Sequence, residues 1–210
     1  DDVMRGFATG DTTLDESVKF GIVAATSHPQ INYGKVNYSS APYSVHPYQS
    51  INYVSSHDDL NLVDKLQISN PDASQEDLLK YDKLAQTIVF TSQGVPFMFN
   101  GEEVFRSKKG VHNSFQSPDS INKINWTNKS IYKDLYTYYK ALISLRKNHP
   151  AFRMQRTEDI QEKLHFLDTG QNGVIAYTLG EYANDDLWKE ILVVFNGNKM
   201  DKQIEIPKEE

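Results

Sequence analysis

Hydrophobic residues recur at helical spacing in three stretches of the chain. In the clearest of them, Ser74 and Asp77 have the spacing of a helix-capping box, and an apolar face follows, formed by Leu78, Tyr81, Leu84, Ala85 and Ile88. Gly94 and Pro96 mark the end of this helix. The same reasoning predicts a helix that opens with the capping box Thr13–Glu16 and breaks near His28, and a third helix over about 131–147.

Short apolar runs predict strands between and after these helices. Residues 29–49 have no period and predict a long loop, and residues 51–54 then predict a strand that runs directly into the polar sequence Ser55-Ser56-His57-Asp58-Asp59. Beyond residue 150, turn signals separate four short predicted strands at 164–167, 174–177, 191–195 and 203–207. The pattern therefore predicts helix–strand alternation over 1–150 and an antiparallel β domain over 151–210.

Composition narrows the classes of function. The chain has 210 residues, a net charge of −6 and no long run of Lys or Arg, which argues against a nucleic-acid partner. It has no Cys, so disulfides and thiolate metal sites are excluded. The sequence contains no membrane-length apolar run and no signal peptide, and the compartment stays open between extracellular, cell-surface and cytoplasmic.

The strongest candidate chemistry is the pair His57-Asp58 at the end of a short strand. In β/α barrels, active groups lie at the C-terminal ends of strands, and a carboxylate there can accept hydrogen bonds from sugar hydroxyls and stabilise positive charge that develops on the sugar ring. A loop His beside a helix-capping Asp explains the bare dipeptide better, because such short motifs occur often by chance. The sequence around the pair favours the catalytic interpretation over chance.

Four blocks of the chain, in the right order, resemble type-I pullulanases of the α-amylase superfamily. Residues 51–66 resemble the seventh-strand region of that family, residues 93–103 the eighth strand, residues 105–122 the loop after it, and residues 164–198 the small β-sandwich that follows the barrel. The resemblance implies an α/β fold class: the C-terminal part of a (β/α)8 TIM barrel over 1–150 and an antiparallel β-sandwich domain over 151–210, both incomplete. The loop at 105–122 favours pullulanase over other members of the superfamily.

The resemblance also assigns roles to individual residues. It makes Asp58 the carboxylate that stabilises the transition state and His57 a hydrogen-bond partner of sugar hydroxyls, with Asn113 and Asp119 as glucan contacts. Two neighbouring acids, Glu102 and Glu103, are tempting as general acids, but the family places its acid on an earlier strand, and this strand end shapes the pocket wall. The chain departs from the family at Asp59, where Asn is common, and at Val63, where an aromatic residue is often found.

The implied reaction is retaining hydrolysis of α-1,6-glucosidic bonds in an α-glucan, with no organic cofactor. Calcium is common in the superfamily, but no Asp-rich ligand loop indicates it here. The alternatives are an α-1,4 hydrolase of the neopullulanase kind and a non-catalytic glucan-binding fragment. The family's nucleophile and acid blocks are not found, so we expect the chain to begin inside the barrel and to be inactive alone. We also expect it to aggregate, to associate with another copy, or to pair with the N-terminal half.

Overall fold

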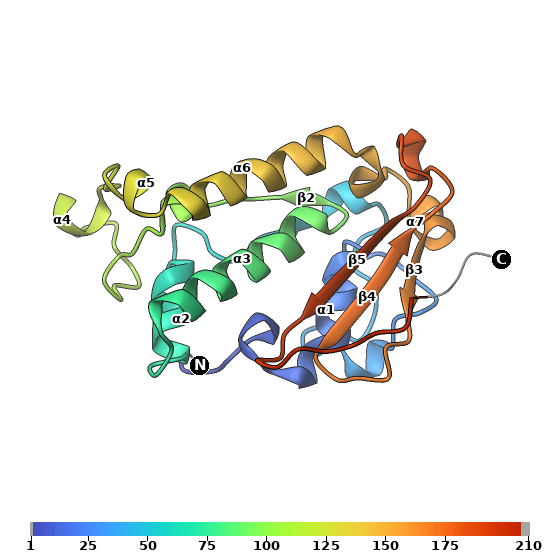
Figure 1. Cartoon of the computed structure of the whole chain (residues 1–210), viewed down its shortest axis with the longest axis horizontal. Helices are drawn as coiled ribbons and strands as arrows, with labels where there is room; N and C mark the ends of the chain where they lie inside the picture. The colour runs from blue at the N-terminus through green and yellow to red at the C-terminus, as the bar shows by residue number, and fades with distance from the viewer. Residues whose placement is uncertain (1, 207–210) are drawn as a thin grey trace.

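The computed structural model of the chain describes residues 2–206. The elements in chain order are α1 (Asp15–Ile22), β1 (Ile51–Asn52), α2 (Leu62–Ser69), α3 (Gln75–Thr91), β2 (Val95–Pro96), α4 (Asp119–Asn122), α5 (Asn128–Ile131), α6 (Lys133–Asn148), α7 (Thr157–Lys163), β3 (Leu164–Leu167), β4 (Val174–Leu179) and β5 (Ile191–Asn196). In Figure 1 the helices α2–α6 occupy one side of the molecule and the strands β3–β5 occupy the other, with α1 packed against that sheet.

The long helices α3 and α6 run side by side and carry one of the two cores (Figure 1). α3 begins where the sequence predicts, because the Ser74 hydroxyl accepts the backbone N–H of Asp77 at 3.1 Å and donates to the Asp77 carboxylate at 2.8 Å. Its apolar face packs against α2 and α6, and Leu66, Leu78 and Tyr139 are buried together there. Helix capping and the spacing of the apolar residues thus fix where this helix starts and which face it buries.

The first sheet is a pair of short parallel strands. β1 and β2 align Ile51 with Val95 and Asn52 with Pro96. The Asn52 side chain donates to the carbonyls of Gly21 at 3.3 Å and Gln93 at 2.8 Å, which ties β1 to the chain on either side. Because the strands are parallel and adjacent, the loops that follow them leave from the same edge.

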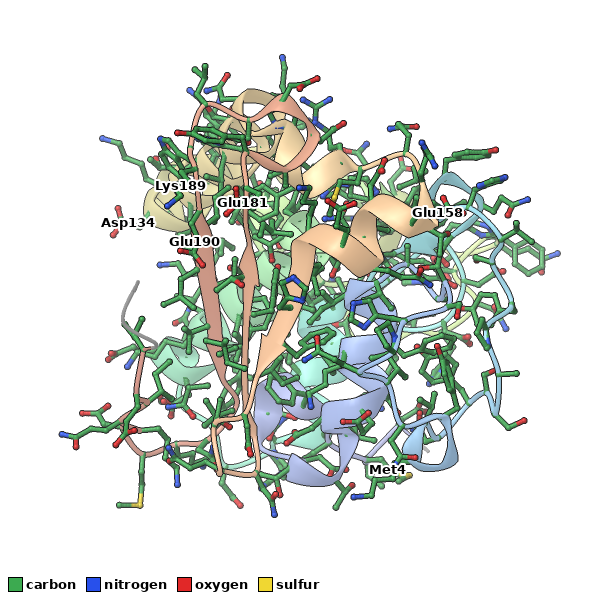
Figure 2. The ribbon with its side chains drawn as sticks, turned by 90° about the vertical axis from the view of Figure 1, so that its right-hand side faces the viewer. Met4, Asp134, Glu158, Glu181, Lys189 and Glu190 are labelled. Carbon is green, nitrogen blue, oxygen red and sulfur yellow. The ribbon has the colours of Figure 1, made fainter. Side chains whose placement is uncertain are left out.

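The second sheet is antiparallel, with β4 between β3 and β5. Leu179 of β4 lies opposite Leu164 on one side and Ile191 on the other. β4 is buried along almost its whole length, as expected of a central strand, and its Tyr177 shares a core with Phe20 of α1. Figure 2 views this sheet from the side and shows the exposed charges of Glu181, Lys189 and Glu190 gathered at the turn that joins β4 to β5.

Two buried polar side chains join segments of the helical part that lie far apart in the sequence. Gln93 donates to the carbonyl of Ala151 and accepts the N–H of Met154, both at 2.9 Å. Arg146 of α6 donates to the carbonyls of Phe90, Ser92 and Gly94 at 2.6–2.9 Å, where α3 ends and β2 begins. These bonds satisfy backbone groups that would otherwise be buried without partners.

The β domain departs from the sequence-based prediction in one strand. Residues 203–206 form no strand, so the fourth predicted strand is wrong; Pro207 lies outside the described residues. The Gln171 side chain, rather than a neighbouring strand, contacts this segment by donating to the Gln203 carbonyl at 2.5 Å. Across residues 2–206 the antiparallel strands make one three-stranded sheet, and the structure as a whole is a small mixed helix-and-sheet fold.

Helix boundaries and four whole helices also differ from the prediction. The predicted capping box at Thr13 is wrong, because Asp11 caps a 3-10 turn by accepting the Thr13 N–H at 3.0 Å, and α1 begins only at Asp15. The sequence predicts none of the helices α2, α4, α5 and α7. All four are short, with eight, four, four and seven residues, and α7 lies in the region predicted to be all β. Helices of this length bury too few residues to show a clear period in the sequence.

Candidate functional site

The loop after β1 presents His57 and Asp58 to solvent. The side chains are 79% and 69% exposed, and His57 Nδ1 lies 3.2 Å from Asp58 Oδ1. The loop begins beyond Asn52 and ends at the buried residues Leu60 and Asn61, just before α2. The pair is therefore held near a strand end, with one side chain in contact with the other and both free to meet a ligand.

The neighbouring loop, which follows β2, is organised by a carboxylate from α2. Asp64, 1% exposed, accepts hydrogen bonds from the Ser107 hydroxyl at 2.5 Å, the Lys108 N–H at 2.6 Å and the Gly110 N–H at 3.2 Å. Three donors around one buried carboxylate compensate its lost hydration. The sequence does not reveal this role, because Asp64 has the spacing of an ordinary polar residue in the first turn of a helix.

Lys108 joins the two loops. Its ammonium group donates to the carbonyls of His57 at 3.2 Å, Asp59 at 2.5 Å and His112 at 2.8 Å. These three bonds use all three N–H groups of the ammonium. Burial lowers the pKa of Lys108, and the nearby carboxylate of Asp64 opposes that shift. The backbone on both sides of Asp58 is therefore fixed by a cation that no sequence motif marks.

Asp59, where the family commonly has Asn, has a left-handed backbone conformation and a side chain close to His112. Asp59 has a φ of +57°, a left-handed conformation in which Asn and Asp are enriched among residues other than Gly. Its carboxylate lies 3.6 Å from His112 Nδ1, and the other ring nitrogen of His112 lies 3.1 Å from Asp2 Oδ2. The Asp59 side chain thus turns toward the loop after β2, where an imidazole can neutralise it when protonated.

Asn113 and Asp119 lie on that second loop and are both exposed. Asn113 directly follows His112, whose carbonyl accepts from Lys108, so it belongs to the region joined to the His57 loop. Asp119 is the first residue of α4, the short helix whose Asn122 side chain donates back to the carbonyls of Ser114 at 2.6 Å and Ser117 at 2.9 Å. The structure therefore connects Asn113 to the His57-Asp58 loop through Lys108, whereas Asp119 is held by contacts within its own loop.

The two acids that follow β2 point elsewhere. Glu102 is buried and accepts hydrogen bonds from the Ser55 hydroxyl, from Gln86 Nε2 at 2.8 Å and from the Phe99 N–H at 3.1 Å. Burial raises its pKa to about 7, against the effect of these donors. Glu103 accepts the backbone N–H of Gly101 at 3.0 Å. Glu102 is thus held in the interior by three donors.

A second buried acid lies near Glu102 and was missed in the sequence. Asp82 of α3 is fully buried, accepts the Tyr139 hydroxyl at 2.7 Å, and has its pKa raised to about 8 by burial and by the charge of Glu102. Its Oδ2 and the Oε1 of Gln86 have no hydrogen-bond partner among the described residues. The available signal was its position in sequence: Asp82 follows Leu78 by four residues and therefore lies on the apolar face of the helix.

Residues 2–206 contain no group of three or more His, Asp or Glu side chains arranged to hold a metal ion. No helix in this part of the chain combines the length and the apolar character needed to span a bilayer.

Comparisons with known proteins match almost the whole chain. Residues 160–210 match the family described as "Pullulanase, all-beta domain". The pullulanase of Bacillus subtilis (strain 168) is 37% identical over 92% of the chain. The structure superposes on the pullulanase from Bacillus acidopullulyticus with a TM-score of 0.88 and 39% identity over 100% of the chain. A pullulanase from Paenibacillus barengoltzii, in complex with maltohexaose and alpha-cyclodextrin, superposes with a TM-score of 0.89 and 35% identity over 98% of the chain. The chain spans 26%, 24% and 30% of these three relatives, respectively.

Proposed function

Because the chain is a homologue of type-I pullulanases over nearly its whole length, we propose that it is part of a glycoside hydrolase that debranches α-glucans. The proposed reaction is hydrolysis of α-1,6-glucosidic bonds, as in pullulan or branched starch, with retention at the anomeric carbon. The observation that carries the proposal is the His57-Asp58 pair, exposed at a parallel strand end and fixed through the backbone by Lys108.

The proposed architecture of the longer enzyme is a (β/α)8 barrel followed by a β-sandwich. Residues 1–150 would supply the C-terminal part of the barrel and residues 151–210 part of the sandwich. Two features support the barrel assignment: β1 and β2 are adjacent and parallel, and the long helices α3 and α6 follow them in the chain. The candidate residues lie on the loops after these two strands, where barrel enzymes carry their active groups.

Asp58 is proposed as the carboxylate that stabilises the transition state. Cleavage of a glycosidic bond passes through an oxocarbenium-like state, and a nearby carboxylate lowers its energy by opposing the positive charge on the ring. The same charge raises the pKa of a neighbouring carboxylic acid and keeps it protonated for transfer to the leaving oxygen. His57, 3.2 Å from Asp58, would donate a hydrogen bond to a sugar hydroxyl at the cleavage site.

Asn113 and Asp119 are proposed to bind the glucan beside this point. Both are exposed, and an amide and a carboxylate can between them donate to and accept from sugar hydroxyls. An α-glucan ligand is consistent with the maltohexaose and alpha-cyclodextrin in the Paenibacillus barengoltzii structure. The loop that carries both residues is braced by Asp64, so these contacts need little ordering when a ligand binds.

The nucleophile and the general acid are assigned to residues outside this chain. Retaining hydrolysis needs two carboxylates beside the scissile bond, one to attack and one to donate a proton. Glu102 is buried with three donors directed at it, among them the Ser55 hydroxyl at the start of the His57-Asp58 loop, so its carboxylate is held in the interior rather than presented to solvent beside Asp58. The chain alone should accordingly release no reducing ends from pullulan, and binding without hydrolysis would then be its own activity.

A chimera tests the assigned roles. The matching quarter of the Bacillus subtilis pullulanase is replaced by this chain, and pullulan hydrolysis is measured for the chimera, for Asp58→Asn and for the exposed control Asp72→Asn. We expect Asp58→Asn to lower kcat at least about 100-fold and to change KM less than about threefold, because the charge acts mainly in the transition state. Loss of binding equal to the loss of kcat, or an equal effect of Asp72→Asn, would contradict the role of Asp58.

A further inference from the structure

A cavity of about 700 Å³ lies between α2, the start of the loop after β2, and the short helices α4 and α5. Polar side chains from separate elements line it, among them Gln67 of α2, Ser107, Ser120 of α4, Asn125 and Tyr132. Its volume is in the range of small-molecule sites in proteins. The cavity is separate from the exposed side chains of His57 and Asp58, which are not part of its lining.

The charges on the cavity wall are all positive. Arg106, Lys109 and Lys123 line it, and none of its lining residues is Asp or Glu. This is unusual for a chain whose net charge is −6. Lys123 and Lys109 are exposed, and no Asp or Glu within residues 2–206 makes a salt bridge with either of them. The wall therefore carries a local excess of positive charge.

Arg106 adds a partly desolvated charge to this wall. Its Nη1 donates to the Asn100 carbonyl at 2.9 Å and its Nη2 to the Asn122 carbonyl at 2.7 Å, while its buried Nε has no partner among the described residues. Carbonyls satisfy hydrogen-bond donors but do not neutralise a full charge. Burial lowers the pKa of this guanidinium, as expected of a cation that lacks a carboxylate partner.

We propose that this cavity binds a phosphate group, supplied either as inorganic phosphate or as the monoester of a sugar. A phosphate dianion can offset the charges of Arg106, Lys109 and Lys123 together, and Arg and Lys are the side chains that bind phosphate best. The neutral groups of Gln67, Ser120 and Asn125 offer donors and acceptors that suit sugar hydroxyls. A neutral glucan could accept hydrogen bonds from these three cations but would not neutralise their charge.

The site would also touch the proposed substrate loop. Ser120 and Ile121 of the lining directly follow Asp119, and Arg106 holds the carbonyl of Asn122 in the same short helix. A ligand in the cavity would therefore contact the segment that presents Asp119. The phosphate proposal does not depend on the reaction proposed above, because it concerns a separate set of side chains.

Calorimetric titration of the full chain at low ionic strength tests the proposal with three probes: inorganic phosphate, glucose 6-phosphate and maltose. We expect saturable binding of a phosphate probe, and we expect maltose neither to bind in the cavity nor to compete with that probe. Lys123→Gln should weaken binding about tenfold, whereas Lys140→Gln, an exposed residue of α6 outside the lining, should leave it unchanged. Tighter binding of glucose 6-phosphate than of phosphate would identify the sugar monoester as the source.

Amide chemical shifts give a second measurement that does not require a variant. Saturating phosphate probe should move the backbone amide signals of Ser107 and Ser120 more than those of His57 and Asp58. The proposal is overturned if neither phosphate probe binds saturably up to about 10 mM. It is equally overturned if Lys123→Gln binds as well as the parent chain, or if maltose displaces the phosphate probe from the cavity.

Discussion

The ammonium group of Lys108 donates a hydrogen bond to the backbone carbonyl of Asp59 at 2.5 Å, across 49 residues of sequence. This bond and its two companions fasten the loop after β1 to the loop after β2. The exposed pair His57-Asp58 therefore has a fixed backbone under freely accessible side chains. Binding sites gain from such an arrangement because less entropy is lost when the ligand arrives.

Replacing Lys108 should destabilise the chain through these carbonyls. Lys108→Met removes all three donors from the two loops and should lower the free energy of unfolding by about 2 kcal/mol. The neighbouring exposed Lys109→Met is the matched control and should change it by less than about 0.5 kcal/mol. Urea unfolding of both variants measures the difference. Equal effects would show that Lys108 is not the connection between the loops.

Stability should fall as the pH rises through neutrality. The pKa values of Asp82 and Glu102 are raised by burial to about 8 and about 7, so the folded state binds these protons more tightly than the unfolded chain does. The stability that the two protonated acids contribute is complete below their ordinary pKa of about 4, and it is lost as the pH rises to about 8. Urea unfolding between pH 5 and pH 8 should therefore show a free energy of unfolding that falls by a few kcal/mol.

Asp82→Asn should flatten that pH dependence, because an amide has no proton to lose. The exposed Asp72→Asn should keep the wild-type slope. The outcome that contradicts the assignment is a pH profile of Asp82→Asn parallel to that of the wild type, which would place the titrating groups elsewhere.

Asp186 should be far more sensitive to substitution than its neighbour Asp185. Burial acts to raise the pKa of Asp186, but the N–H groups of Trp188 and Ala151 and the ring of His149, at 2.9–3.2 Å, together lower it. Asp186→Asn places an amide N–H against one of these donors and should lower the free energy of unfolding by about 2 kcal/mol. Asp185→Asn, on the exposed side of the same turn, should cost almost nothing. Thermal unfolding of the two variants measures this difference, and equal melting temperatures would refute the prediction.

The stability contributed by Asp186 should depend on pH with the opposite sign to that contributed by Asp82. Because the folded-state pKa of Asp186 is lowered, its contribution is present above the ordinary pKa of about 4 and disappears as the pH falls through the folded value. The difference in stability between wild type and Asp186→Asn should therefore shrink in acid.

Two glycines offer a matched test of packing between the chain start and the sheet. A Cβ at Gly197 would lie 2.5 Å from the Phe7 carbonyl oxygen, whereas a Cβ at Gly180 would have no atom within 4 Å. Gly197→Ala should thus destabilise the chain by about 1–3 kcal/mol, since the backbone of Phe7 must move. Gly180→Ala should be neutral or slightly stabilising. A neutral Gly197→Ala, measured by urea unfolding, would mean that this contact is not as close in solution.

The local pattern of the sequence predicts the elements whose partners are nearby in the chain. α3 follows from Ser74, Asp77 and its apolar spacing, and β4 follows from a continuous apolar run between turn signals. The strand predicted over 203–207 fails, because alternation alone does not supply a neighbouring strand to pair with. The short helices α2 and α7 were missed for the related reason that tertiary contacts, more than periodicity, stabilise them.

For the candidate site, too, some features follow from the sequence and others only from the tertiary structure. By itself the sequence determined that a His-Asp pair follows a short strand, and its resemblance to type-I pullulanases assigned roles to His57, Asp58, Asn113 and Asp119, which remain predictions. Only the tertiary structure decided that Lys108 is a buried brace, that Glu102 faces the interior and that Arg106 borders a cationic cavity. Bonds such as those of Lys108, Asp64 and Arg146 join residues more than 40 positions apart. No local spacing encodes such a pair, because it forms only when the packed chain excludes water from both partners.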